Sequence, residues 1–293
     1  MQRTYPILFW RPFYDFFSIA LVIGVAVYLS VAVSWWFYPL SALLIANRLL
    51  ALSLLCHEGL HGTLSRHRRF NDFFGRYLCA YPTMISFNKY RRVHLLHHGS
   101  VGSENWDPDR HLYVQYPENA GRYLSSMMWQ VITLKNAYSF FQYYTDLPDL
   151  FKILTRKMRP ERLHKSNDVL SFLIFYILLF VAVVASGLSL YFVLLYLVPV
   201  IFIMQPYVIL MGGLQHGPVR SQDAPGGPSR TVVGSRIYMW LLLPLNINYH
   251  AEHHQEPAIP HYWLRDFSED QARAGQKLWQ DSYCGALRAL FKP

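Results

Sequence analysis

Eight of the 13 histidines fall into three groups that have the spacing of metal ligands. One group has the pattern His-x-x-x-His, and the other two share the pattern His-x-x-His-His. Residues three or four positions apart lie on one face of an α-helix, so the imidazoles of each group can point at one metal ion. Scattered surface histidines would not repeat this spacing, and the sequence therefore predicts a shared metal site. The groups are His57 and His61; His94, His97 and His98; and His250, His253 and His254.

The first group leaves two kinds of metal chemistry open. The segment His57-Glu58-Gly59-Leu60-His61 fits the zinc-protease pattern, in which the glutamate is the general base. A catalytic zinc takes only three protein ligands, however, which is far fewer than the clustered histidines. A binuclear centre would use about four or five histidines per metal, and imidazole suits iron, copper, nickel and zinc alike. The spacing therefore favours two metals but does not choose the element.

Four apolar runs can bring these histidines to one level. They cover 16–34, 40–56, 169–186 and 188–211, and each approaches the ~20 residues that a helix needs to cross a bilayer. The first two runs are separated by an aromatic cluster with a proline, and the last two by a glycine, so we expect two helical hairpins. The fourth run continues to His216, which we predict as a ninth ligand.

The basic residues set the expected orientation. Of the 27 lysines and arginines, only Arg48 lies inside a predicted span. Because basic residues collect in cytoplasmic loops, both termini and the polar blocks 57–168 and 212–293 should be cytosolic. Arg48 should face the bundle and bond to polar groups of neighbouring helices; a substrate contact is the alternative. The net charge of +9 fits a surface beside anionic lipid, and no nucleic-acid-binding motif is present.

The polar blocks contain further expected elements. Segments 77–87 and 123–144 should form interfacial helices, and 217–230 is rich in Pro, Gly and Ser and should be a loop. Segment 232–245 should be an interfacial helix, with a fifth span as the alternative. Four other histidines lack partners at ligand spacing and are expected at the surface: His67, His111, His164 and His261. Of these, His111 and His261 could support the metal ligands.

Two longer motifs resemble those of a known family. Asn248-Tyr249-His250-Ala251-Glu252-His253-His254, followed by Pro257 and Ile259-Pro260, resembles the third histidine box of lipid desaturases. The segment from Tyr90 to His98, with the downstream Glu104 and Asp107-Pro108-Asp109, is similar to the second box. The chain thus resembles the membrane fatty acid desaturase and hydroxylase superfamily over nearly its whole length. The expected fold is an all-α integral membrane domain over 1–293, with four transmembrane helices in two hairpins and a cytosolic helical cap that carries the histidine boxes.

The resemblance implies two iron ions that use O2 and external electrons to remove hydrogen from an unactivated C–H bond. The implied activity is desaturation of a fatty acyl chain of a lipid or acyl thioester. The alternative is hydroxylation or ketolation of an acyl chain, alkane, sphingolipid or carotenoid, and the less favoured reading is a membrane zinc metalloprotease. The implied iron ligands are His57, His61, His94, His97, His98, His216, His250, His253 and His254.

One position departs from the family. Some desaturases have an asparagine four residues before the histidine that corresponds to His216, where it holds a metal-bound water; here the residue is Gly212. Gln215 could hold that water instead, so the reaction outcome is less defined than the metal site. Four carboxylates near the histidines could orient ligand imidazoles through their second nitrogens. They are Glu58, Asp107, Asp109 and Glu252.

The electrons must come from another protein, because no haem-binding or flavin-binding segment is fused to the chain. A ferredoxin or a small haem protein is the expected donor. Acidic donors of this kind would dock on a basic surface through charge complementarity. The proposed docking residues are Arg66, Arg68, Arg69, Arg91 and Arg92.

Overall fold

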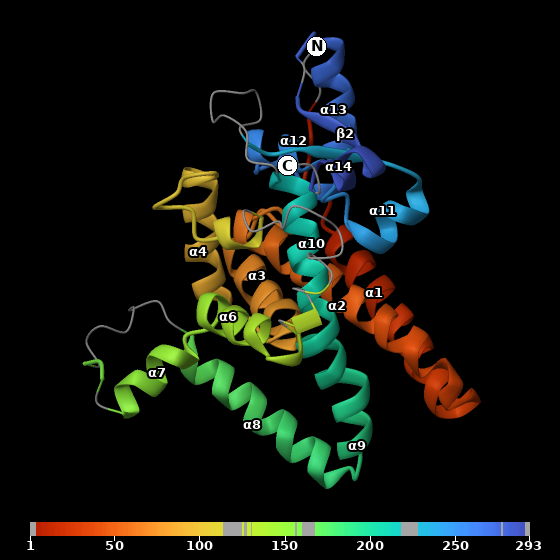
Figure 1. The fold of residues 1–293 in the computed structure, drawn as a ribbon, viewed down its shortest axis with the longest axis vertical. Helices are drawn as coiled ribbons and strands as arrows, with labels where there is room; N and C mark the ends of the chain where they lie inside the picture. The colour runs from red at the N-terminus through yellow and green to blue at the C-terminus, as the bar shows by residue number, and fades with distance from the viewer. Residues whose placement is uncertain are drawn as a thin grey trace.

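The computed structural model describes residues 4–290 apart from 114–124, 126–127, 130, 156, 160–167, 218–227 and 277. Most of this chain is helical, and Figure 1 shows the long helices in the lower part of the molecule and short elements around their upper ends. His164, most of the expected loop 217–230 and the start of the expected helix 123–144 lie outside the described residues.

Three helices are long and apolar enough to cross a membrane: Arg11–Val33, Trp35–His61 and Ser189–His216. They correspond to the first, second and fourth predicted spans. The third predicted span forms α8 (Val169–Ala185), whose 17 residues cover about 26 Å and fall just short of a bilayer core. The chain is a helical membrane protein, and the four-span arrangement stays a prediction.

The first span begins at α1 (Arg11–Tyr28) and continues as a π-helical turn to Val33. Only 17% of the residues in its most apolar stretch are buried, and side chains such as Phe17 and Leu21 are exposed. Exposed apolar side chains along a whole helix are unfavourable in water and favourable in lipid. The second span is central instead. In its most apolar stretch 78% of the residues are buried, and its helix α2 (Tyr38–His61) ends at Gly62, whose φ of 78° suits a glycine.

The third long helix changes its winding along its length. It starts as α9 (Ser189–Phe192), has π-helical stretches at Val193–Leu197 and Pro199–Ile203, and becomes the regular α10 (Met204–His216). Proline lacks a backbone N–H, so the regular ladder of hydrogen bonds cannot pass Pro199. Figure 1 shows the tight turn between α8 and α9 at the lower end of the molecule, where Gly187 has a φ of 71°.

The short elements surround the histidine-bearing ends of α2 and α10. A two-stranded parallel sheet joins β1 (Thr231–Val233) to β2 (Gln280–Ser282). The helices before this sheet are α3 (Arg68–Phe73), α4 (Phe87–Ser100), α6 (Lys135–Tyr144) and α7 (Leu147–Leu154). Those that follow β1 are α11 (Arg236–Leu242), α12 (His250–Gln255), α13 (Leu264–Arg273) and α14 (Tyr283–Ala289).

Two predicted interfacial helices were partly wrong. Within 77–87, a π-helical stretch ends at Ala80, a turn covers Tyr81–Thr83, and Tyr81 and Phe87 are fully buried. The apolar residues of this segment therefore belong to the core and not to the membrane surface. Within 232–245, Val232 lies in β1 and only α11 is helical, because Val232 pairs with Asp281. In the described chain this segment is not a candidate for a fifth span.

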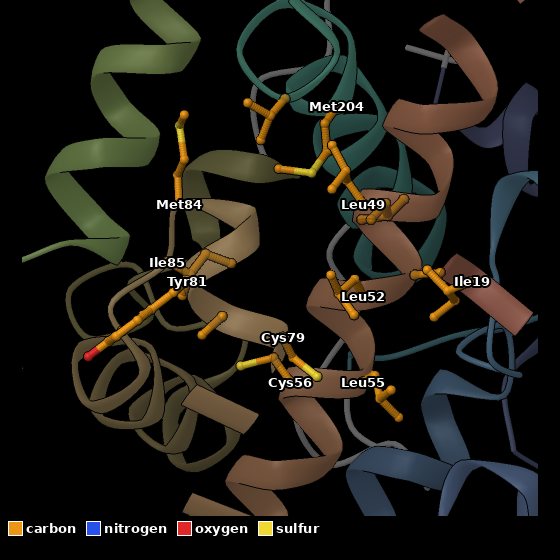
Figure 2. Close-up of a cluster of buried hydrophobic side chains, with 14 of the residues drawn as sticks. Ile19, Leu49, Leu52, Leu55, Cys56, Cys79, Tyr81, Met84, Ile85 and Met204 are labelled. Carbon is orange, nitrogen blue, oxygen red and sulfur yellow. The ribbon is translucent and has the colours of Figure 1, made fainter. Parts of the chain in front are cut away.

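The core packs α2 against the segment 74–85. Figure 2 shows Cys56 of α2 beside Cys79, and Ile19 of α1 and Met204 of α10 belong to the same buried cluster. This packing fixes the last turns of α2 against the rest of the protein. The position of the first histidine pair depends on it.

Substituting Gly75 with alanine should destabilise the protein, because a Cβ at that position would lie 2.5 Å from Cε2 of the buried Phe87. Overpacking of this kind typically costs about 1–3 kcal/mol. Thermal unfolding in detergent measures the effect, and Gly24→Ala is the matched control because a Cβ there meets nothing within 4 Å. Equal melting temperatures for the two variants would contradict the tight packing of Gly75.

Candidate metal centre

Four helices bring the nine predicted histidines together. Helix α2 supplies the first pair from its last turns, α4 the second group, α10 its final residue and α12 the third group. The ligand atoms form two sets, and within each set they lie within 4.8 Å of one another. One set holds five histidines: His57, His61, His94, His98 and His253. The other holds four: His97, His216, His250 and His254.

The Nε2 atoms converge at the separations of ligands on one metal. Nε2 of His94 lies 2.8 Å from Nε2 of His61 and 2.9 Å from Nε2 of His98. In the second set, Nε2 of His250 lies 2.9 Å from that of His216 and 3.1 Å from that of His254. Two nitrogens bound at right angles to one metal would be about 3 Å apart. The imidazoles therefore fit two metal positions.

The two sets adjoin each other. The rings of His98 and His254, one from each set, stack with their centroids 4.2 Å apart. The ring of His97 lies 5.1 Å from that of His254 and 6.0 Å from that of His94. Metals held by the two sets would thus be neighbours, as a binuclear centre requires.

Burial favours the neutral imidazole, which is the form that binds metals. Burial, together with the neighbouring imidazoles, lowers the pKa of His94, His250 and His253 well below its ordinary value. Nδ1 of His250 is buried and makes no hydrogen bond within the described chain. Buried polar groups normally have hydrogen-bond partners. A cluster of buried, neutral imidazoles that lacks such partners is expected at a metal site.

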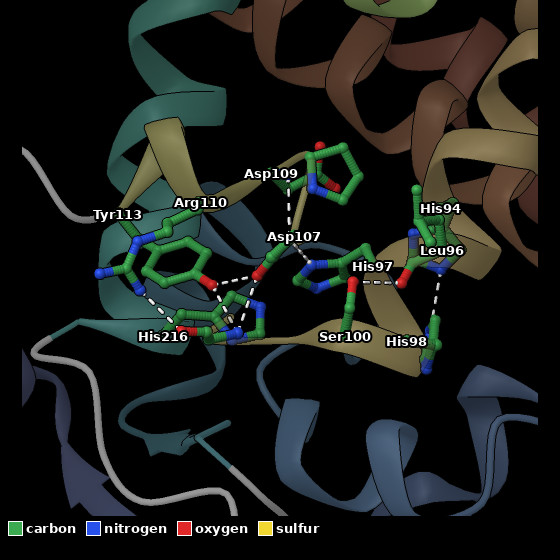
Figure 3. Close-up of polar contacts among 12 residues, drawn as sticks. His94, Leu96, His97, His98, Ser100, Asp107, Asp109, Arg110, Tyr113 and His216 are labelled. Carbon is green, nitrogen blue, oxygen red and sulfur yellow. Dashed lines mark hydrogen bonds and ion pairs between the residues drawn. The ribbon is translucent and has the colours of Figure 1, made fainter. Parts of the chain in front are cut away.

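Asp107 holds the imidazole of His97. Its Oδ1 lies 2.8 Å from Nδ1 of His97, and Figure 3 shows it between that ring and Tyr113. Its Oδ2 accepts hydrogen bonds from the Tyr113 hydroxyl and, at 2.8 Å, from the backbone N–H of Gly102. Burial alone would raise the pKa of Asp107, but His97 and these donors hold it at about 2. The carboxylate is therefore charged and can orient His97 toward a metal.

The other predicted carboxylates are also buried, but only one lies beside a ligand. Oε1 of Glu58 is 3.7 Å from Nδ1 of His57. Asp109 accepts a hydrogen bond of 2.7 Å from Tyr144, and its backbone N–H donates to Asp107. Glu252 accepts a hydrogen bond from Thr231. Asp109 and Glu252 thus support the residues around the histidines and make no direct contact with an imidazole in these bonds.

A buried chain of bonds connects Glu58 to helix α1. Oε2 of Glu58 accepts hydrogen bonds from the Thr63 hydroxyl at 2.6 Å and from the backbone N–H of His261 at 3.0 Å. Nε2 of His261 lies 3.0 Å from Oδ2 of Asp15, which also pairs with Arg11. The surface position expected for His261 was therefore wrong, because only 3% of it is exposed. His67 is exposed as expected, and His111 is half-buried.

An apolar cavity of about 90 Å³ opens against both histidine sets. Histidines from both sets line it, together with other polar residues such as Asp109 and Gln215; these histidines are His57, His94, His97, His216 and His250. Most of the other lining residues are aliphatic or aromatic, among them Leu50, Phe140, Met204 and Val208. An apolar group in this cavity would therefore lie beside both candidate metal positions.

Gly212 and Gln215 also line this cavity. A Cβ at Gly212 would lie 3.1 Å from Cβ of Leu112, so a longer side chain there would have to displace Leu112. The Gln215 amide donates a 3.0 Å hydrogen bond to the carbonyl of Ile247. Leu112 thus occupies the space beside the position that is an asparagine in some desaturases.

The arginines of the predicted docking surface differ in their exposure. Arg91 is half-buried and pairs with Asp72, and Arg92 pairs with Asp146 at 3.0 Å. These two arginines therefore serve the packing of α4, and the docking hypothesis narrows to three exposed residues. They are Arg66, Arg68 and Arg69.

Arg48 faces the protein interior, as predicted for a charge on a span. Its Nη2 donates a 2.7 Å hydrogen bond to the carbonyl of Trp240, and its Nε donates to Asn47. The guanidinium carbon lies 3.9 Å from the centre of the Trp240 ring, within cation–π range. The predicted bonding to polar groups of neighbouring segments is confirmed.

Comparison with known proteins identifies the class. The model of the fatty acid desaturase family matches residues 33–281, which include all nine histidines. A helical membrane protein with this histidine cluster is an oxidoreductase of the desaturase type, and the chain belongs to the fatty acid desaturase family.

Three proteins that are similar in sequence to this chain catalyse different reactions. Dihydrorhizobitoxine desaturase of Bradyrhizobium elkanii is 28% identical over 252 residues, which cover 83% of this chain and 70% of that protein. An sn-1 acyl-lipid omega-3 desaturase (ferredoxin) of Synechocystis is 27% identical over 99 residues, or 32% of this chain and 27% of the relative. A β-carotene 4-ketolase of Protosiphon botryoides is 33% identical over 61 residues, or 20% of this chain and 16% of the relative.

Proposed function

We propose that the protein is an oxygen-dependent di-iron desaturase that introduces a double bond into a fatty acyl chain of a lipid or acyl thioester. The observation that carries the proposal is the apolar cavity that is lined by histidines from both ligand sets. Such a cavity would hold a hydrocarbon segment beside two metals and exclude bulk water from the reacting carbons.

The residues of the site have two roles: some would bind the irons, and others would orient these ligands. Five histidines would hold one iron and four the other, and the bound irons would supply the activation of O2 for removal of hydrogen from a C–H bond. Asp107 would fix the orientation of His97, and Glu58 would do the same for His57. Because these carboxylates are anchored by Tyr113, Thr63 and the backbone of His261, the ligands would be pre-organised before metal binding.

The proposal also covers the membrane topology of the enzyme and its electron donor. The domain would span the membrane several times with both termini and the active site in the cytosol, so that a lipid substrate reaches the cavity from the bilayer. A ferredoxin would be the electron donor, as the name of the Synechocystis relative indicates for that protein. It would dock on the exposed Arg66, Arg68 and Arg69. Unchanged reduction rates after charge reversal of these arginines would contradict the docking surface.

A hydroxylase or ketolase is the second candidate, and two observations favour it. One relative is a β-carotene 4-ketolase, and Gly212 stands where some desaturases have a water-holding asparagine. The zinc-protease alternative is disfavoured by Glu58, whose oxygens lie against Thr63, His261 and His57 and are not free to activate a water.

Product analysis separates the candidates. The full chain in lipid vesicles, loaded with iron, would be supplied with reduced ferredoxin, O2 and a mixture of acyl lipids or carotenoid, and the products examined by mass spectrometry. Desaturation predicts a product lighter by two hydrogen atoms, formed only with O2. A product that is heavier by one oxygen atom and carries label from ¹⁸O2 would establish the hydroxylase reading instead.

A further inference from the structure

A second cavity of about 730 Å³ lies between α1, α2, α11 and α13. It shares no lining residue with the apolar cavity at the histidines. Four arginines line it, against only two carboxylates, those of Asp15 and Glu269. The arginines come from helices far apart in the sequence: Arg11, Arg48, Arg236 and Arg265.

Two of these arginines already have counter-ions. Nε of Arg11 lies 3.0 Å from Oδ2 of Asp15, and Nε of Arg265 lies 3.1 Å from Oε1 of Glu269. These pairs use both carboxylates of the cavity. Any further positive charge in it needs a partner from elsewhere.

The other two arginines have none among the described residues. Arg48 bonds only to neutral groups, the Asn47 amide oxygen and the Trp240 carbonyl, and its Nη1 makes no hydrogen bond there. Arg236 is exposed and makes no hydrogen bond or ion pair with the part of the chain that the structure describes. Arg48 is only 4% exposed, and a buried charge without a counter-ion is costly. An anion in this cavity would remove that cost.

The side chains around the cavity indicate which kind of anion it would bind. Tyr14 and Trp240 line the cavity and are 59% and 44% exposed, and Tyr and Trp are the residues that favour membrane–water interfaces. Beside them, α1 exposes the apolar Phe17 and Leu21, and α11 exposes Ile237. Figure 1 shows α11 beside the upper part of α1. A two-part ligand, with an anionic head and hydrocarbon chains, matches a charged cavity that borders a lipid-facing helix.

We propose that this cavity binds the phosphate of an anionic membrane phospholipid, with Arg48 and Arg236 as its counter-charges and with acyl chains along α1. A phosphate accepts several charge-assisted hydrogen bonds from guanidinium groups. The buried Nδ1 of His261, which lines the same cavity and has no hydrogen-bond partner in the described chain, offers one more polar contact for the headgroup. The residues that line this binding site are different from those that line the cavity at the histidines.

Thermal unfolding of the full chain in a neutral detergent tests the site. Micelles doped with phosphatidylglycerol should raise the melting temperature in a saturable way, since a ligand of the folded state stabilises it by mass action. Phosphatidylcholine of the same acyl chains should not. Arg236→Gln should weaken the apparent affinity for phosphatidylglycerol about fivefold, because one basic residue contributes about 1 kcal/mol toward anionic lipid. Arg236→Lys should restore most of it.

Arg69→Gln is the matched control, because Arg69 is exposed and does not line the cavity. The proposal fails if phosphatidylcholine stabilises the protein equally, or if Arg69→Gln weakens binding as much as Arg236→Gln. It also fails if inorganic phosphate alone produces the full stabilisation, because the cavity would then bind a free anion and not a lipid.

Discussion

Replacing His254 with alanine is expected to remove about one of two metals per chain and to reduce activity by more than about 100-fold. Loss of a residue that only supports a metal ligand costs up to about 100-fold, and loss of the ligand itself should cost more. His254 belongs to the four-histidine set, so its loss leaves three imidazoles at that position and five at the other. His253→Ala should remove the other metal in part, because four histidines remain in its set. The double variant should lose one metal and part of the other. Metal analysis of the purified proteins, together with turnover, measures these effects.

His67→Ala is the control for the histidine variants, since His67 is exposed and belongs to neither set. It should keep its metal and its activity. If His254→Ala and His67→Ala retained equal metal, the division of the histidines into two metal positions would be wrong.

Asp107→Asn is expected to lower metal affinity or activity about 10- to 100-fold, the range observed for partners of metal-bound histidines. The amide keeps the size of the side chain but removes the negative charge beside Nδ1 of His97. The pKa of Asp107 is held at about 2, below its ordinary value, so the carboxylate is ionised at all higher pH. The loss should therefore be the same from about pH 5 to pH 8.

A suitable control for this variant is Glu104→Gln, three residues earlier. The side chain of Glu104 is 82% exposed and pairs only with Arg110 among the described residues. Such exposed pairs contribute little. Competition with a chelator gives the metal affinity of both variants, and turnover gives their activity. Equal affinities together with equal activities would show that Asp107 does not support His97.

The ligand candidates could be predicted from the sequence because helical spacing is local. His57 and His61, or His94 and His98, share a face wherever a helix forms, and the apolar length of α2 places its last turns at one end. His216 followed from its place at the end of the fourth apolar run. The structure adds what spacing does not contain, namely which histidines share a set. His97 and His98 are adjacent in sequence but belong to different sets.

The supporting residues were harder to predict because they depend on long-range packing. Asp15 and His261 are 246 residues apart and meet only because α1 lies beside the segment after α12. An aspartate among the apolar residues of α1 was a usable signal, since a buried carboxylate needs a partner. The ion pairs of Arg91 and Arg92 had no such signal, because exposed and paired arginines look alike in a sequence.

The boundaries of the apolar segments show the limits of hydropathy. The predicted run 40–56 ended at the first histidine, whereas α2 continues to Gly62, where the left-handed conformation ends the helix. For α8, by contrast, the predicted run 169–186 agrees with the helix to within one residue, because Asp168 marks its start and Gly187 follows its end. The segment 77–87 has the composition of a membrane surface helix, yet contact with α2 buries it.

The most direct test of the account is elemental mass spectrometry of the purified, unmodified protein, combined with visible spectroscopy. The account predicts about two irons per chain, because the nine histidines form two adjoining sets and the resemblance to the desaturase family implies iron. A single zinc per chain, lost when His57 or His61 is changed and retained when His253 and His254 are changed, would contradict it.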